Sequence, residues 1–461
     1  MDSSAVFYRS PNDNYPKMVR GSGRRLWDDA GNAYLDLTSG FSGAALLGFG
    51  REDLAAALAE QAARLSYVHN ARVTNEQQEL LANDLVTIVG QNTGRVMFTS
   101  GGSEANEVSL RIARQYHLAR GDASRWKAVS LAPSYHGATV GALSLTGRTA
   151  LTDPYDPTLL PWPKAQYPIK YRGPFADLDD GTLAKRAAEE VADAIERAGP
   201  ETVSAVVGEP ISPSAGTAVP PPGYWPLVRE ICDAYGVLLI ADEVITGVGR
   251  TGAFRCLDHY NTTADMTNLA KGLGAGYYPI AATLVSERIV ETISEAHRRM
   301  PEVHTFSGSP IGCAVGRRVV AAVVSEDLVP KADRDGQELG ELLADRLGAL
   351  PWVGDIRGKG LMWSVEYVRD RETRLPFPPS AGVAALMTKA TWSRGCIVST
   401  NAYNDPIAEP GGGSPRGRLV GDCTVLLPAL TSEPSELEQG VEILRAAIEE
   451  TLPVVAGSLE D

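Results

Sequence analysis

Short apolar runs bounded by glycine or proline alternate with amphipathic stretches between about residues 95 and 325. Apolar runs of this length predict buried strands. Four stand out: 95–99 (RVMFT), 127–131 (KAVSL), 203–207 (VSAVV) and 237–241 (VLLIA). The amphipathic stretches between them predict helices, and alternation of strand and helix is typical of a largely parallel sheet covered on both faces. The pattern therefore predicts an α/β fold.

Two of the amphipathic stretches have clear helical periodicity. Residues 103–121 place Val108, Ile112 and Tyr116 on one stripe, and residues 223–236 repeat this arrangement. Such a stripe packs against the sheet while the opposite face meets solvent. Ligands of open parallel sheets bind beyond the carboxyl ends of the strands, so functional residues are expected there.

The two ends of the chain have a different pattern. Residues 24–37, RRLWDDAGNAYLDL, predict a hairpin with a turn at Asp-Asp-Ala-Gly-Asn. After about residue 330 follow a helix, the strand-like GLMWSVEYV, a second helix, a polar loop and a final helix. We interpret residues 71–330 as a large α/β domain, and residues 1–70 and 331–461 as two parts of one smaller α+β domain.

Composition narrows the class of protein. The chain has 461 residues, enough for more than one domain, and no apolar run long enough to span a membrane. Its first residues, MDSSAVFYRSPNDNYP, lack the pattern of a signal peptide, and its five cysteines are scattered without a CxxC pair. A cytoplasmic protein with reduced thiols is expected, without a structural metal.

The charge balance argues against nucleic acid as a partner. Forty-three basic and 57 acidic residues give a net charge of −14, and no basic stripe with interleaved aromatic residues offsets it. DNA would be repelled by such a protein. A membrane surface is equally disfavoured, so the partners are expected to be small molecules.

Two predicted strands end in groups suited to binding a flat anionic ligand. The strand 95–99 leads into Ser-Gly-Gly-Ser-Glu and then a helix, where Gly102 and Ser103 offer a close backbone approach, free amides and a hydroxyl. An ordinary helix cap would use the same residues. The strand 127–131 leads to Tyr135 and His136, an aromatic ring and an imidazole at a neighbouring strand end.

Two further strands end in acids. Glu209 ends the third strand just before Pro210, and Asp242-Glu243 ends the fourth after a run of apolar residues. A carboxylate at the end of a central strand is costly unless it meets a cation. The glycines of GVGRTG at 247–252 match GxGxxG, but no apolar helical stripe follows, so a dinucleotide site is not expected there.

A lysine completes the set of groups. Lys271 lies in NLAKGLGAGYYP among small and apolar neighbours, in a segment too rich in glycine to continue a helix. Pyridoxal 5′-phosphate needs an anion site for its phosphate, a stacking partner, an acid for its ring nitrogen and a lysine for its aldehyde. The strand ends and Lys271 together predict this cofactor, and apolar surroundings would lower the pKa of the lysine.

The motifs also resemble a known family over nearly the whole chain. SGGSEANEVSLRIAR, SYHG, EPISPSAG, IADEVITGVGRTG, NLAKGLGAGYYP and HTFSGSPIGCA follow the order and spacing of class III aminotransferases, which have the type I fold of pyridoxal-phosphate enzymes. The resemblance implies transfer of an amino group from an amine or amino acid to a keto acid or aldehyde by a ping-pong mechanism. It also implies a homodimer with active sites at the interface.

The same resemblance assigns roles to individual residues. Lys271 would form the internal aldimine and move the proton, and Asp242 would pair with the ring nitrogen. The other cofactor residues it implies are Gly102 and Ser103 at the phosphate, Tyr135 and Val244 on the two ring faces, His136 and Glu209 beside the ring, and Thr305 at the phosphate of the neighbouring subunit.

The substrate side departs from part of the family. Arg418 matches the mobile arginine that accepts a substrate carboxylate, whereas ornithine and 4-aminobutyrate enzymes carry an arginine at the position of Ala138 and a glutamate at that of Ser214. We expect Ala138 and Phe41 to line the substrate site. The segment SGFSGAALLGFG, with Ala44 and Ala45, predicts a roomier amine side.

Another reaction fits the same cofactor residues. A racemase, epimerase or aminomutase on this scaffold would share all of them, so the motifs leave this alternative open. The sequence does not indicate the physiological donor and acceptor.

Overall fold

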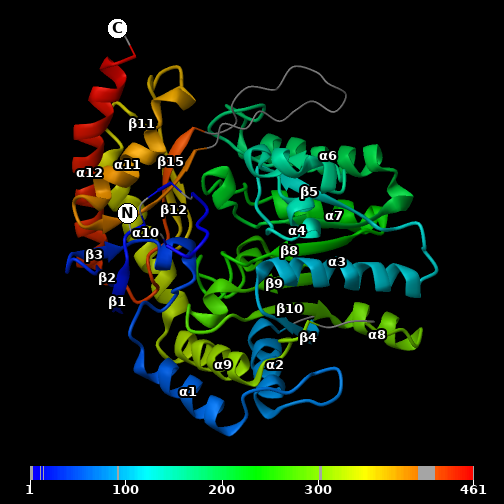
Figure 1. Ribbon diagram of the computed structural model, residues 1–461. Coiled ribbons are helices and arrows are strands. Elements are labelled where there is room, and N and C mark those ends of the chain that lie inside the picture. Colours follow the sequence, from blue (N-terminus) through cyan, green and yellow to red (C-terminus); the bar gives the residue numbers. More distant parts are fainter. Residues whose placement is uncertain are drawn as a thin grey trace.

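The computed structural model describes residues 4–10, 12–13, 15–90, 93–300, 304–402 and 421–459. Within these residues, a seven-stranded sheet with the order β4-β10-β9-β8-β7-β5-β6 forms the centre (Figure 1). From β9 to β6 all neighbours are parallel, whereas β10 is antiparallel to both β4 and β9. The strands span Thr93–Thr99 (β4), Lys127–Ala132 (β5), Lys164–Gln166 (β6), Val203–Gly208 (β7), Leu238–Asp242 (β8), Met266–Leu269 (β9) and Ala281–Ser286 (β10).

Helices cover both faces of this sheet because successive strand residues point to opposite sides. Val207 and Ile240 belong to the core beneath α3 and α8, whereas Val206 and Leu239 belong to the core beneath α6 and α7. The helices span Glu52–Arg64 (α1), Glu76–Val89 (α2), Gly102–Ala119 (α3), Val140–Leu145 (α4), Thr149–Thr152 (α5), Asp180–Ala198 (α6), Tyr224–Tyr235 (α7), Glu287–Glu295 (α8), Pro310–Ser325 (α9), Leu328–Leu347 (α10), Val383–Trp392 (α11) and Pro434–Gly457 (α12).

Two four-stranded sheets lie beside the central one, where α10, α11 and α12 cover them (Figure 1). The first has the order β1-β2-β3-β13, and β13 pairs in parallel with β3, so the two ends of the chain share one sheet. The second has the order β11-β12-β15-β14. Their strands span Met18–Ser22 (β1), Arg25–Asp28 (β2), Ala33–Asp36 (β3), Val353–Gly358 (β11), Trp363–Tyr367 (β12), Cys396–Ile397 (β13), Ser399–Ala402 (β14) and Asp422–Leu426 (β15).

The predicted α/β fold is confirmed, although the sequence pattern identified only four of the seven central strands and did not indicate that one of them is antiparallel. The four predicted strands correspond to β4, β5, β7 and β8, and the predicted hairpin to β2 and β3. β10 is the exception, since it runs against the others, yet its residues are as apolar as theirs. No helix in the described part of the chain is long and apolar enough to cross a membrane.

The parallel arrangement brings several strand ends to one edge of the sheet. β4 points the same way as β5, β7, β8 and β9, since β10 is antiparallel to both of its neighbours. The loops that follow these five strands therefore start at the same edge, where ligands of such sheets bind.

The segment GVGRTG after β8 forms consecutive turns and does not open a helix. Its arginine, Arg250, is fully buried and donates hydrogen bonds to the carbonyl oxygen of Leu361 at 3.0 Å and the hydroxyl of Ser39 at 3.1 Å. Burial lowers the pKa of its guanidinium to about 9. The segment joins the central sheet to residues near both chain ends, and no strand-turn-helix for a dinucleotide is formed.

Candidate active site

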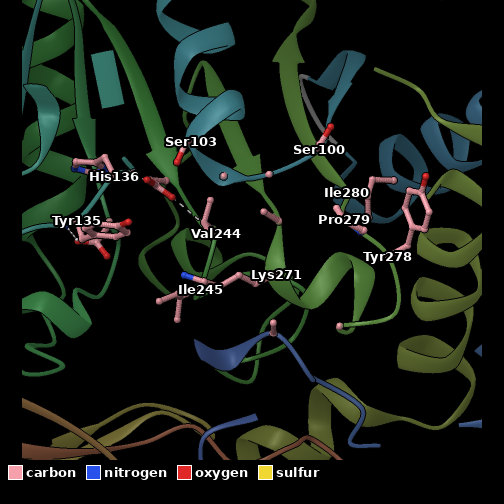
Figure 2. A pocket seen from close by; sticks show the side chains of 18 residues that line it. Ser100, Ser103, Tyr135, His136, Val244, Ile245, Lys271, Tyr278, Pro279 and Ile280 are labelled. Carbon is pink, nitrogen blue, oxygen red and sulfur yellow. Dashed lines mark hydrogen bonds and ion pairs between the residues drawn. The ribbon is translucent and has the colours of Figure 1, made fainter. Parts of the chain in front are cut away.

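A cavity of about 400 Å³ lies at the edge of the sheet where the five strands end. Figure 2 shows the Lys271 side chain extending toward Tyr135 and Ile245, with Ser103 at the helix terminus above. Eight of the nine predicted cofactor residues line this cavity: Gly102, Ser103, Tyr135, His136, Glu209, Asp242, Val244 and Lys271. They come from five separate segments of the chain.

The beginning of α3 brings backbone amides and a hydroxyl group to the wall of the cavity. Gly101 is its N-cap and provides no side chain to bind the amides of the first turn, which have no acceptor within the helix. The Ser103 hydroxyl accepts a hydrogen bond from the Ala138 amide at 3.2 Å, which leaves its own proton to donate. A Cβ on Gly137 would lie 2.4 Å from the Ser103 Oγ, so this packing requires glycine.

Asp242 ends β8 at the buried side of the cavity and is 4% exposed. Its Oδ2 accepts hydrogen bonds from His136 Nδ1 and from Asn106 Nδ2, both at 2.8 Å, and its Oδ1 accepts one from the Val244 amide at 3.1 Å. Three donors stabilise the ionised carboxylate. These hydrogen bonds hold the carboxylate of Asp242 in one orientation at the wall of the cavity.

The adjacent acid, Glu243, points elsewhere. Its carboxylate accepts hydrogen bonds from the amides of Cys256 and Leu257, and it lines neither of the cavities described here. Burial raises its pKa to about 7. The strand pattern by itself left both acids open and the family resemblance implied Asp242, which is the one of the two that lines the cavity.

Two buried asparagines behind Asp242 were not singled out from the sequence. Asn106 also donates to the carbonyl oxygen of His136 at 2.7 Å, and Asn268 donates to Asn106 Oδ1 at 2.9 Å. The Thr283 hydroxyl extends this hydrogen-bond network by donating to Asn268 Oδ1 at 2.8 Å. Asn106 could have been found from the sequence as a polar amide on the predicted buried stripe of α3, because a buried amide needs hydrogen-bond partners.

An Asn106→Ala variant should test this network. The change removes one donor from Asp242 and one of the two acceptors of the Asn268 amide, which keeps only the Ser109 hydroxyl, and this costs roughly 1–3 kcal/mol. The free energy of unfolding, measured by urea titration, should fall by that amount. An unchanged unfolding curve would contradict the structural role of the network.

Lys271 follows β9 and begins a short 3₁₀ segment, Lys271–Gly274, with a φ of +32°. Its environment lowers the pKa of the ammonium group, because burial disfavours the charge, while Asp242 and Glu209 oppose the shift. A lowered pKa increases the fraction of neutral amine at a given pH. The neutral amine is the form of lysine that can act as a nucleophile.

Glu209 follows β7 and is 5% exposed. Its Oε2 accepts hydrogen bonds from the Tyr135 amide at 3.1 Å and the Ser212 hydroxyl at 2.8 Å. Burial, with Asp242 nearby, raises its pKa to about 7, against the effects of His136 and these two donors. Because ionisation is costly in the folded state, this group lowers stability as pH rises from about 4.5 through about 7.

A second cavity of about 690 Å³ adjoins the first and shares Tyr135, Gly137, Glu209, Ile245 and Lys271 with it. Two of the predicted substrate residues, Phe41 and Ala138, line this second cavity, as does Ser214. Much of the rest of its wall is apolar: Val140, Leu143, Leu151, Leu159, Val425 and Leu427.

Two predicted residues are not brought to these cavities. Thr305 is exposed at the surface and lines neither of them within its own chain. Arg418 lies outside the described residues. Ile245 and Tyr278 line the first cavity without having been singled out, since apolar and aromatic residues in glycine-rich segments give no distinct signal.

Comparison with known proteins identifies relatives over nearly the full length. The family model for aminotransferase class-III matches residues 8–402. An uncharacterized aminotransferase of Schizosaccharomyces pombe is 34% identical over 453 residues, covering 97% of this chain and 95% of the relative.

Solved structures agree with this relationship. An (S)-enantioselective omega-transaminase from Thermomicrobium roseum has a TM-score of 0.87 and 35% identity, covering 96% of this chain and 94% of that one. The omega transaminase of Pseudomonas jessenii in complex with PMP has a TM-score of 0.88 and 29% identity, covering 97% of both chains.

Proposed function

Since the chain belongs to the class III aminotransferase family, we propose that Lys271 and Asp242 are the central residues of its active site. The protein is a pyridoxal-phosphate-dependent transaminase. The observation that carries the assignment of residues is that a lysine with a lowered pKa and a buried carboxylate line one cavity with the beginning of α3.

The donor set of the cavity fits pyridoxal phosphate. The free amides at the beginning of α3, with the Ser103 hydroxyl, suit the phosphate, and the ionised Asp242 suits a protonated ring nitrogen. Tyr135 and Val244 line the cavity and would contact the ring. A volume of about 400 Å³ lies within the range of small-molecule sites.

Lys271 has two tasks in this assignment. Its Nζ would bond to the cofactor, which when bound supplies an electron sink for charge at the reacting carbon. Once the amine of the substrate has displaced it from the cofactor, Nζ would be a free neutral amine that accepts the proton from the substrate carbon bearing the amino group and returns it to the carbon that carried the aldehyde. Burial favours the neutral form of the amine that this transfer requires.

Asp242 is proposed to act on the ring nitrogen of the cofactor and not on the proton that is transferred. Its charge keeps the ring nitrogen protonated, and His136, Asn106 and the Val244 amide hold the carboxylate in place. This arrangement makes Asp242 an electrostatic partner fixed before the substrate arrives, so little reorganisation is needed during the reaction.

The second cavity is proposed to bind the donor, an amine or amino acid, and the acceptor, a keto acid or aldehyde. It opens onto Lys271 and is lined by Phe41 and Ala138. Its volume of about 690 Å³ and the apolar part of its wall suit a bulky apolar group. Arg418 is proposed to accept a substrate carboxylate.

A homodimer is proposed, with Thr305 contacting the phosphate bound in the neighbouring subunit. Support comes from the surface around Thr305, where the side chains of Tyr67 and Phe306 are 41% and 56% exposed. Their rings meet edge to face, with 5.9 Å between the ring centroids. Exposed aromatic residues of this kind are enriched in subunit interfaces.

The proposed transaminase activity can be tested through its first half-reaction, in which the donor amine reacts with the bound cofactor in the absence of a keto acid. Purified protein loaded with pyridoxal phosphate is expected to be yellow, and a donor amine alone should bleach this absorbance once per subunit. Addition of a keto acid should restore it. A racemase, epimerase or aminomutase would convert its substrate without stoichiometric bleaching, and protein that takes up no cofactor would refute the assignment.

A further inference from the structure

Glu209 occupies an unusual place among the acids of the active site. It lines both cavities, together with Lys271, and so lies where cofactor and substrate would meet. Asp242 lines only the first cavity, and Glu243 lines neither. An acid shared by both cavities needs a role of its own, because a bare carboxylate there would face the negative charges of Asp242 and of the cofactor.

The hydrogen bonds of Glu209 decide where a proton would reside. Oε2 accepts from both the Tyr135 amide and the Ser212 hydroxyl. No partner for Oε1 is found among the described residues. A carboxyl group with two donors on one oxygen places its own proton on the other, so the protonated group presents an O–H donor on Oε1.

Burial and the nearby Asp242 favour the protonated form of Glu209 and outweigh the groups that oppose them. Burial and Asp242 raise the pKa of its carboxyl group to about 7, while His136, Ser212 and the Tyr135 amide lower it. Lys271, whose own pKa is lowered by burial, also interacts with it electrostatically, and Tyr167 donates from its hydroxyl to the Glu209 carbonyl oxygen. An anionic cofactor would favour the proton still further.

The proposed binding mode leaves one polar group of the cofactor without a partner. The α3 terminus takes the phosphate, Asp242 the ring nitrogen and Lys271 the aldehyde carbon, which leaves the anionic oxygen on the ring. This oxygen is bonded to the carbon next to the one that bears the aldehyde, and it therefore lies on the Lys271 side. The side chain of Ile245, which also lines both cavities, has no group to donate to it.

On the basis of the proposed function, we propose that Glu209 donates a hydrogen bond from Oε1 to the ring oxygen of pyridoxal phosphate. Glu209 is then a positioning residue for the cofactor that works only while it keeps its proton. Ionisation of Glu209 would replace a donor with a repulsive charge, so cofactor binding should weaken as pH rises through the titration of this group.

The experiment follows the visible absorbance of the bound cofactor with pH, and cofactor affinity by equilibrium titration. Wild-type enzyme should show an absorbance transition at or above about pH 7, with affinity falling across it. Glu209→Gln keeps a donor and cannot ionise, so it should lack this transition and lose less than about threefold in affinity at low pH.

Ser212→Ala provides a second variant that keeps Glu209 in place. It removes a donor that favours the ionised form, so the transition should move upward by about half to one pH unit. Glu243→Gln is the matched control, because it changes an equally buried acid whose pKa is also raised to about 7 but which lines neither cavity. Its transition should equal that of the wild type.

The outcomes separate this inference from the proposed function. Protein that binds no cofactor would refute the proposed function. Protein that binds the cofactor, but in which Glu209→Gln retains the wild-type transition, would refute only the role of Glu209. An unshifted transition in Ser212→Ala would refute it as well, and this result stands even if Glu209→Gln fails to fold.

Discussion

A Lys271→Ala variant is expected to lose transaminase activity by about a thousandfold or more, because it removes both the bond to the cofactor and the base that moves the proton. Its fold should remain, since Lys271 follows β9 and its side chain extends into the cavity, outside the apolar core. After borohydride treatment, cofactor should remain attached to the wild type but not to the variant. Rates measured with one donor and one keto acid quantify the loss.

Lys164 offers a matched control. It is also largely buried, its pKa is lowered to about 8 by burial, and its Nζ donates to the carbonyl oxygen of Ser144 at 3.0 Å. It lines neither cavity, so Lys164→Met should leave turnover within about threefold of wild type even if stability falls. Equal loss of turnover in both variants would contradict the role of Lys271.

An Asp242→Asn variant is expected to lower kcat by about 10² to 10³-fold, the range seen when one fixed electrostatic partner is removed. Asparagine has the same shape, so the packing around the cavity should persist. It cannot keep the ring nitrogen protonated, however, and the electron sink would weaken. Steady-state rates, with cofactor content measured by absorbance, separate this effect from loss of the cofactor.

Asp265 is the matched control for this substitution. It is a buried aspartate, 8% exposed, that pairs with Arg229 and Arg288 and lines neither cavity. Asp265→Asn should therefore lower the free energy of unfolding and leave the turnover of the folded enzyme nearly unchanged. If Asp242→Asn retained full turnover, the cavity would not use Asp242 in the proposed way.

The fold and most residues of the candidate site could be predicted from the sequence, because the signals that indicate them lie in short stretches of adjacent residues. Strand and helix periodicity is written in adjacent residues, and the groups that follow each strand can be identified directly. Because parallel strands end at the same edge, the sequence alone predicts that the groups after them meet there. Five such residues line the same cavity: Ser103, Tyr135, Glu209, Asp242 and Lys271.

The directions of individual side chains and strands could not be predicted from these local patterns. Asp242 and Glu243 are neighbours in sequence, but only Asp242 lines the cavity, since successive strand residues point to opposite faces and the register is set by the sheet. The reversed direction of β10 was likewise undetermined, because an apolar strand has the same composition in either direction. The roles of Thr305 and Arg418 remain predictions.

The sequence by itself determined the family, the α/β architecture and the chemical groups at the strand ends, because these depend on local pattern and residue type. Only the tertiary structure decided which oxygen of Glu209 accepts from Tyr135 and Ser212, which asparagines support Asp242, and which residues the two cavities share. Hydrogen bonding and burial join residues far apart in the chain, and these contacts lower the pKa of Lys271 and raise that of Glu209.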